Sequence, residues 1–270
     1  MKQRIITALW GIPLLLAFIY FDTHWFPLII FLIAAFAIAG AVEFYRLAAL
    51  SEGQPFTIFG IVWVMLFVAS AHFERLDFTS SLLASAVALP LIFSFGFRRE
   101  KPFLNWGWTL AGILYMGWML SRYVALRELA HGRELVIFAI FSTFACDTVA
   151  FFVGRAWGKH HMTPTISPKK TWEGAVAGFI AAPAAALVLH IILNLGGWEL
   201  PLSYAQTTIL GCLIGLFAQL GDLLESLLKR KAGVKDSGSL IPGHGGILDR
   251  IDSLVFTGVI VYYYVIWVVV

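Results

Sequence analysis

The sequence predicts an all-α integral membrane protein with about nine transmembrane helices. Of its 270 residues, 60% are hydrophobic and only 13% are charged. A soluble domain is about half apolar and about a quarter charged, so this chain lacks the polar residues that a soluble surface requires. The mean hydropathy of +0.84 indicates the same class. The net charge of +3 is too small to indicate a nucleic-acid partner.

Apolar segments long enough to cross a bilayer recur along the whole chain. One crossing requires about 20 residues of helix. The first segment resembles a signal peptide, but no small-residue cleavage site follows it, so we interpret it as a retained span. Glycine pairs at 174 and 178 and at 211 and 215 favour close helix packing. The expected spans are 5–21, 26–44, 57–73, 79–97, 104–121, 134–154, 172–194, 205–228 and 251–270.

The distribution of basic residues predicts the orientation of these spans. With the N-terminus in the cytoplasm, 15 of the 19 Lys and Arg residues fall in cytoplasmic segments. Loops on the cytoplasmic side of membrane proteins carry such an excess. The C-terminus is then expected outside. We expect one membrane-embedded domain over 1–270, with few specific features in 1–130 and the catalytic half in 134–270.

Acidic residues flank a polar segment between the last two predicted spans. Asp222 and Glu225 are three residues apart on one predicted helix, and Asp249 and Asp252 repeat this spacing on the next. A carboxylate at membrane depth normally pairs with a cation, binds an ion or faces water. The alternatives are carboxylates solvated at the interface, or acids stabilised by a helix N-terminus.

Basic residues lie between the two acidic pairs, at Lys229, Arg230, Lys231 and Lys235. Alone, such a cluster is typical of binding to anionic lipid headgroups. Together with carboxylates it indicates more, because Mg²⁺ commonly takes one or two carboxylates plus substrate phosphates. Basic side chains hold the remaining phosphate charge. The segment therefore predicts a magnesium-dependent polyphosphate site.

Glycines surround His244 in the same segment. Gly245 and Gly246 allow backbone amides to approach a phosphate closely. The alternative is an ordinary turn. His244 is expected either to donate a hydrogen bond to phosphate or to cap the turn.

A second polar segment lies near the start of the seventh predicted span. Its Ser167-Pro-Lys-Lys-Thr171 sequence offers hydroxyl groups and two ammonium groups just before a helix, where anions bind readily. The alternative is a topology anchor followed by a helix cap at Thr171. Asp147, inside the sixth predicted span, needs a partner, and the metal site or the cations of this segment are candidates.

Residues 226–252 resemble the signature of the phosphatidate cytidylyltransferase family. The similarity covers the apolar spacers as well as the polar residues, and segment 147–174 resembles the family's second polar segment. The matching positions are Ser226, Lys229-Arg230, Lys235-Asp236, Gly238, Ile241-Pro242, His244-Gly245-Gly246, Asp249-Arg250 and Asp252.

The resemblance implies an enzyme that converts CTP and phosphatidate to CDP-diacylglycerol and pyrophosphate. It also implies a homodimer among membrane lipids, in a bacterial cytoplasmic (inner) membrane with its active site facing the cytoplasm. Mg²⁺ is the implied cofactor, with room for a second cation such as K⁺. Asp222 and Asp249 are the main implied metal ligands, and Glu225, Asp252 and Asp147 are weaker candidates.

The resemblance also assigns roles to individual residues. The implied catalytic residues are Asp222, Asp249, Lys235 and His244. The implied substrate-binding residues are Ser167, Lys169, Lys170, Thr171, Ser226, Lys229, Arg230, Asp236, Gly245, Gly246 and Arg250.

Two other functions fit parts of the pattern. A CTP-dependent transferase could act on another lipid, such as an isoprenoid or ether lipid. A transporter could use intramembrane acids and interrupted helices. The transporter is disfavoured because the polar residues gather toward one predicted face and the sequence shows no inverted repeat.

Overall fold

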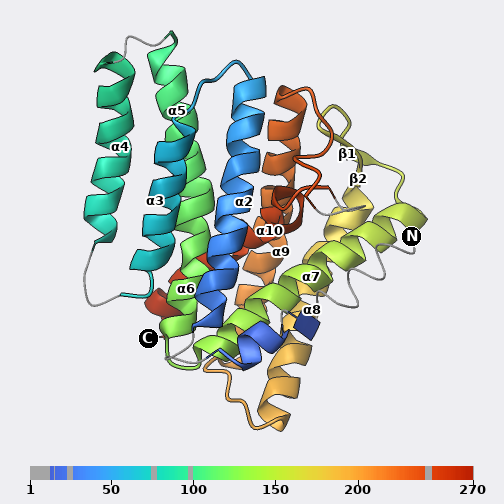
Figure 1. Cartoon of the computed structure of the whole chain (residues 1–270). Helices are drawn as coiled ribbons and strands as arrows, with labels where there is room; N and C mark the ends of the chain where they lie inside the picture. The colour runs from blue at the N-terminus through green and yellow to red at the C-terminus, as the bar shows by residue number, and fades with distance from the viewer. Residues whose placement is uncertain are drawn as a thin grey trace. The chain divides into compact units, whose positions relative to one another are not determined.

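The chain is almost entirely helical in the computed structural model, which describes residues 13–14, 16–22, 27–73, 78–96, 100–240 and 245–269 (Figure 1). His244 and most of the first predicted span lie outside these residues. The described elements are α2 (Leu28–Leu50), α3 (Thr57–Ser70), α4 (Thr79–Gly96), α5 (Pro102–Gly112), η1 (Ile113–Met119), α6 (Leu120–Glu128), α7 (Gly132–Trp157), β1 (His161–Thr163), β2 (Ser167–Thr171), α8 (Trp172–Leu195), α9 (Tyr204–Lys231), α10 (Leu248–Tyr264) and η2 (Val265–Val269).

Within the described residues, six helices are long and apolar enough to cross a membrane. They are Leu28–Leu50, Thr79–Gly96, Gly132–Trp157, Trp172–Leu195, Tyr204–Lys231 and Leu248–Val269. The predicted span 57–73 is a shorter apolar helix, Thr57–Ser70. The predicted span 104–121 lies on a helical run that passes through the π-helical segment η1. The nearly all-α class is therefore confirmed, with six candidate membrane spans among the described residues, whereas nine spans and their orientation stay predictions.

The polar segment before α8 differs from the expected all-α chain because it contains a β-hairpin. Strands β1 and β2 pair antiparallel, with His161 opposite Thr171 and Thr163 opposite Ser167. The Ile166 amide donates to the Thr163 carbonyl across the turn at 3.2 Å. Pro168 is tolerated in β2 because a two-stranded sheet leaves each strand an unpaired edge.

One compact unit consists of residues 1–125 and 231–250. Its helices α2, α3, α4 and α5 lie side by side (Figure 1). Tyr45 of α2 is buried, and its hydroxyl donates to the Thr109 carbonyl of α5 at 3.0 Å. A Cβ atom at Gly60 or Gly112 would overlap the Tyr45 ring. These two glycines therefore make room for the Tyr45 side chain.

The second compact unit consists of residues 126–230 and 251–270. Helices α7 and α8 pack closely, since a Cβ at Gly178 would lie 2.9 Å from the Cys146 carbonyl oxygen. A Cβ at Gly211 of α9 would lie 2.5 Å from Cα of Pro183 in α8. The glycine pairs thus allow the close helix packing that their spacing predicts.

Gly211→Ala tests this close packing. The added methyl group meets backbone atoms of Pro183, which cannot rotate away. We therefore expect the free energy of unfolding to fall by about 1–3 kcal/mol. The melting temperature of the purified protein in detergent measures the effect. Gly107→Ala is the matched control, because a Cβ there has no neighbour within 4 Å and alanine favours helix. Equal melting temperatures for the two variants would contradict the packing argument.

Candidate active site

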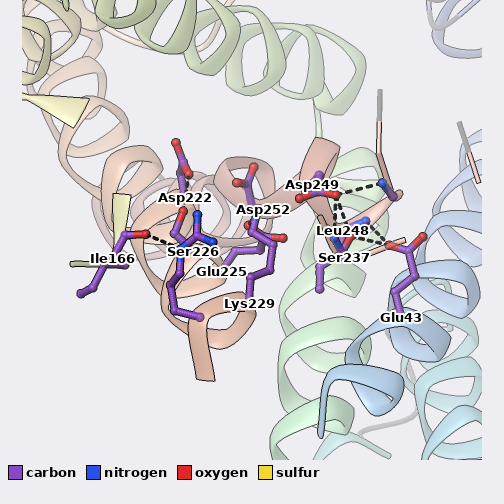
Figure 2. Close-up of polar contacts among 12 residues, drawn as sticks. Glu43, Ile166, Asp222, Glu225, Ser226, Lys229, Ser237, Leu248, Asp249 and Asp252 are labelled. Atoms are coloured by element: carbon purple, nitrogen blue, oxygen red, sulfur yellow. Dashed lines mark hydrogen bonds and ion pairs between the residues drawn. The ribbon is translucent and has the colours of Figure 1, made fainter. Parts of the chain in front are cut away.

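Three carboxylates of the second unit converge where α9 meets α10. Asp222 and Glu225 come from α9 and Asp252 from α10, and one oxygen atom of each lies within 4.8 Å of the others (Figure 2). Their spacing on α9 puts Asp222 and Glu225 on one helix face. Gly221 lets α10 approach this face, since a Cβ there would lie 2.5 Å from the Asp252 carbonyl oxygen. We call Asp222, Glu225 and Asp252 the acidic cluster.

Lysine side chains compensate part of this negative charge. Lys170 Nζ lies 2.8 Å from Asp222 Oδ2 in a partly exposed ion pair. Lys229 forms an ion pair with Glu225, which lies one helical turn earlier on α9 and has a side chain that is 0% exposed. Asp147 of α7 is a further acidic neighbour that interacts electrostatically with Asp222 and Lys170. The acidic cluster is therefore paired with one lysine from each of the two polar segments, Lys170 and Lys229.

The acidic cluster has a donor set suited to a divalent cation. Three carboxylates this close repel one another, and the repulsion is strong where water is scarce. Hard oxygen ligands of this kind match the preference of Mg²⁺. The residues present therefore fit a magnesium ion. The pairing of Asp222 with Asp249 on one ion stays a prediction.

The β1–β2 hairpin is joined to α9 beside the acidic cluster. Arg230 Nε donates to the Ile166 carbonyl at 2.9 Å, which ties the hairpin turn to the end of α9 (Figure 2). The Ser226 hydroxyl donates to Asp222 Oδ1 at 3.4 Å. Thr171 Oγ1 accepts the Gly174 amide at 3.3 Å as the N-cap of α8, so the helix-cap alternative is confirmed for this residue.

Asp249, in the first turn of α10, accepts hydrogen bonds from the loop that precedes this helix in the first unit. Its Oδ2 atom accepts from the amide and the hydroxyl of Ser237 and from the amide of Gly246, each at 2.9 Å. Gly245 has φ of +81°, and a Cβ there would lie 2.7 Å from the same oxygen atom. Of the two glycines that we expected to cradle phosphate, Gly246 donates its amide to Asp249 and Gly245 leaves space for the Asp249 carboxylate.

Glu43 contacts the same loop, and its role was not predicted from the sequence. It lies on α2, is 8% exposed, and accepts from the Ser237 hydroxyl at 2.8 Å (Figure 2). It also accepts from the amides of Ile247 at 3.1 Å and Leu248 at 2.9 Å. A single carboxylate inside the apolar span expected at 26–44 was the available signal.

The remaining predicted site residues are mostly exposed. Lys235, Asp236 and Arg250 have exposed side chains, and their assigned roles stay predictions. Ser167 and Lys169 lie on β2, in the same strand as Lys170. The structure thus brings the β2 segment to the acidic cluster through the Lys170–Asp222 ion pair.

Carboxylates beside lysines at the ends of apolar helices are the groups with which membrane enzymes handle phosphate and divalent metal. The chain belongs to the cytidylyltransferase family, whose sequence model matches residues 2–268. It is 30% identical over 271 residues to the phosphatidate cytidylyltransferase of Bacillus subtilis (strain 168), covering 97% of both chains.

Two further relatives have the same printed function. The phosphatidate cytidylyltransferase of Brucella abortus biovar 1 (strain 9-941) is 33% identical over 231 residues, covering 84% of this chain and 80% of the relative. The chloroplastic phosphatidate cytidylyltransferase 5 of Arabidopsis thaliana is 35% identical over 229 residues, covering 76% of this chain and 55% of the relative.

Lys229→Met tests the buried ion pair of the acidic cluster. It leaves the Glu225 carboxylate, which is fully buried, without its lysine, so we expect a loss of about 3–5 kcal/mol in stability. Adding Glu225→Gln should recover part of this loss, because the buried charge is then removed. Lys159→Met, at an exposed position, is the control, and thermal melting in detergent is the measurement. A melting temperature for Lys229→Met equal to that of the control would contradict the proposed compensation.

Proposed function

We propose that this chain is a phosphatidate cytidylyltransferase, which converts CTP and phosphatidate to CDP-diacylglycerol and pyrophosphate. Membership of the cytidylyltransferase family and relatives with this printed function support the substrates. The observation that carries the proposal is the acidic cluster, with oxygen atoms within 4.8 Å and lysines on two sides. This donor set suits a reaction in which two anions meet.

Asp222, Glu225 and Asp252 would hold Mg²⁺, with Asp249 and Asp147 as further candidates. Their oxygen atoms and the close approach of α9 and α10 at Gly221 support this assignment. The ion, when bound, neutralises phosphate charge and stabilises the pyrophosphate leaving group. A second cation such as K⁺ belongs to the same proposal, on the family resemblance alone.

The chain's own residues have mainly electrostatic roles in this reaction. A phosphatidate oxygen attacks the α-phosphorus of CTP, and the bond from that phosphorus to the bridging oxygen breaks to release pyrophosphate. The attacking phosphate is already ionised near neutral pH, so no strong base is required. Lys170 and Lys229 would exchange part of their contact with the carboxylates for contact with phosphate. Arg230, through Ile166, would keep the hairpin with Lys169 beside α9.

Location and assembly complete the proposal. The excess of basic residues in alternate connecting segments supports an active site on the cytoplasmic face of a bacterial cytoplasmic (inner) membrane. A homodimer is proposed from the family resemblance. Six apolar helices that could span a membrane would let the acyl chains of phosphatidate remain in the lipid phase.

Incorporation of labelled CTP into lipid tests the function and the metal together. Purified protein with phosphatidate should form CDP-diacylglycerol and pyrophosphate, a chelator should abolish both, and Mg²⁺ should restore them. Other phosphorylated lipids offered as acceptors should react more slowly. A faster reaction with an isoprenoid or ether lipid phosphate would show that this lipid, and not phosphatidate, is the substrate.

Asp252→Asn tests the acidic cluster. Loss of one anionic ligand should lower kcat/KM on the order of 100-fold or more, because several kcal/mol of charge stabilisation are removed. The Mg²⁺ concentration giving half-maximal activity should rise. Glu199→Gln, at an exposed position between α8 and α9, should retain activity. A wild-type rate and a wild-type magnesium requirement for Asp252→Asn would remove this residue from the metal site.

A further inference from the structure

The carboxylate of Glu43 holds the start of helix α10. Ile247 precedes α10 and Leu248 is its first residue, and their amides donate to Oε1 and Oε2 of Glu43 respectively. The first amides of a helix lack partners within the helix and carry partial positive charge. Glu43 therefore satisfies two of these amides from another helix.

Ser237 connects Glu43 to Asp249. Its hydroxyl oxygen lies 2.8 Å from Glu43 Oε2 and 2.9 Å from Asp249 Oδ2. A hydroxyl group has one proton, so it donates to one of these carboxylates at a time. The Ser237 amide donates independently to Asp249 at 2.9 Å. One serine thus fixes the distance between a carboxylate of α2 and a carboxylate of α10.

Two glycines leave the space that Glu43 occupies. A Cβ atom at Gly238 would overlap the Glu43 carboxyl group, and one at Gly246 would overlap both that group and the Ser237 hydroxyl. Gly246 also donates its amide to Asp249. Both glycines are therefore needed for the carboxylate to reach the loop, apart from any contact with phosphate.

The partners of Glu43 distinguish it from the acidic cluster. It is 8% exposed, and the partners found for it among the described residues are amide and hydroxyl groups. A buried carboxylate held by two backbone amides and a hydroxyl group has a fixed position, since any displacement leaves its charge uncompensated. Of these partners, Ser237 also donates to the Oδ2 atom of Asp249, which accepts from the Gly246 amide next to Ile247 as well.

We infer that Glu43 is a positioning residue of the cytidylyltransferase reaction, which sets Asp249 and the first turn of α10 through Ser237 and the amides of Ile247 and Leu248. It acts from the N-terminal part of the chain, whose sequence carries no part of the family signature. The catalytic consequence rests on the proposed function, whereas the structural consequence does not depend on it.

Glu43→Gln tests the inference with little change in shape. The amide group turns a donor toward donors, so at least one hydrogen bond to the loop is lost. We expect kcat for CDP-diacylglycerol formation to fall about 10–100-fold, as for supporting residues around other sites, while KM for CTP changes less than about threefold. Hydrogen exchange should accelerate at the amides of residues 245–250 and remain unchanged in α7 and α8.

Ser237→Ala is the second variant, because it removes only the shared hydroxyl. The double variant Glu43→Gln/Ser237→Ala should be no slower than the slower single variant, since both act through Asp249. Glu52→Gln is the matched control. Glu52 is exposed, pairs with Lys101 Nζ at 2.7 Å and lies two residues after α2, so its variant should keep the wild-type rate.

A wild-type rate for Glu43→Gln would overturn the inference. So would a rate loss with unchanged hydrogen exchange at residues 245–250, or hydrogen exchange that accelerates equally throughout α7 and α8. Additive losses in the double variant would also contradict a route through Ser237. If the wild-type protein makes no CDP-diacylglycerol, the proposed function fails, and the exchange experiment still decides whether Glu43 holds α10.

Discussion

Negative charge on apolar helices must be compensated locally, and this constraint shapes the polar part of the molecule. Removing a carboxylate from water costs several kcal/mol unless cations or hydrogen-bond donors replace the water. Glu225 is compensated by Lys229 on its own helix, and Asp222 by Lys170 from the hairpin. Glu43 is compensated by backbone amides and a serine hydroxyl. Asp222 and Glu43 thereby each bind a second segment of chain, whereas Glu225 is paired within α9.

The two kinds of compensation suit different tasks. An ion pair that is partly exposed, such as Lys170–Asp222, can be rearranged when another anion or cation arrives, because its lysine is flexible. Hydrogen bonds from backbone amides cannot be rearranged without moving the helix that carries them. The acidic cluster therefore has adaptable charge, whereas the Glu43 contacts have fixed geometry. A multiply charged nucleotide must be neutralised and its reacting atoms must be aligned before it reacts.

Much of the fold could be predicted because apolar length and helical spacing are local properties of the sequence. The same spacing correctly put Asp222 and Glu225 together. Lys170 and Lys229 were assigned to phosphate, and their ion pairs with these two carboxylates were not predicted. The hairpin was not predicted, since Pro164 and Pro168 favour an irregular loop when strand pairing cannot be foreseen. Glu43 was missed for a related reason. Its partners lie about 200 residues away in sequence, and no periodicity reports which distant amides a buried carboxylate will meet.

No linker residue separates the β1–β2 hairpin from helix α8. Thr171 ends β2 and caps α8, and the next residue, Trp172, donates its amide to the His160 carbonyl ahead of β1 at 2.9 Å. Changes in chain length are therefore tolerated unequally along this segment. An extra residue in the turn at 164–166 lengthens only the hairpin tip. An extra residue after Thr171 rotates the whole of α8 by about 100°, which turns Gly174 and Gly178 away from α7. Evolutionary insertions among relatives should consequently accumulate at the tip and avoid the junction.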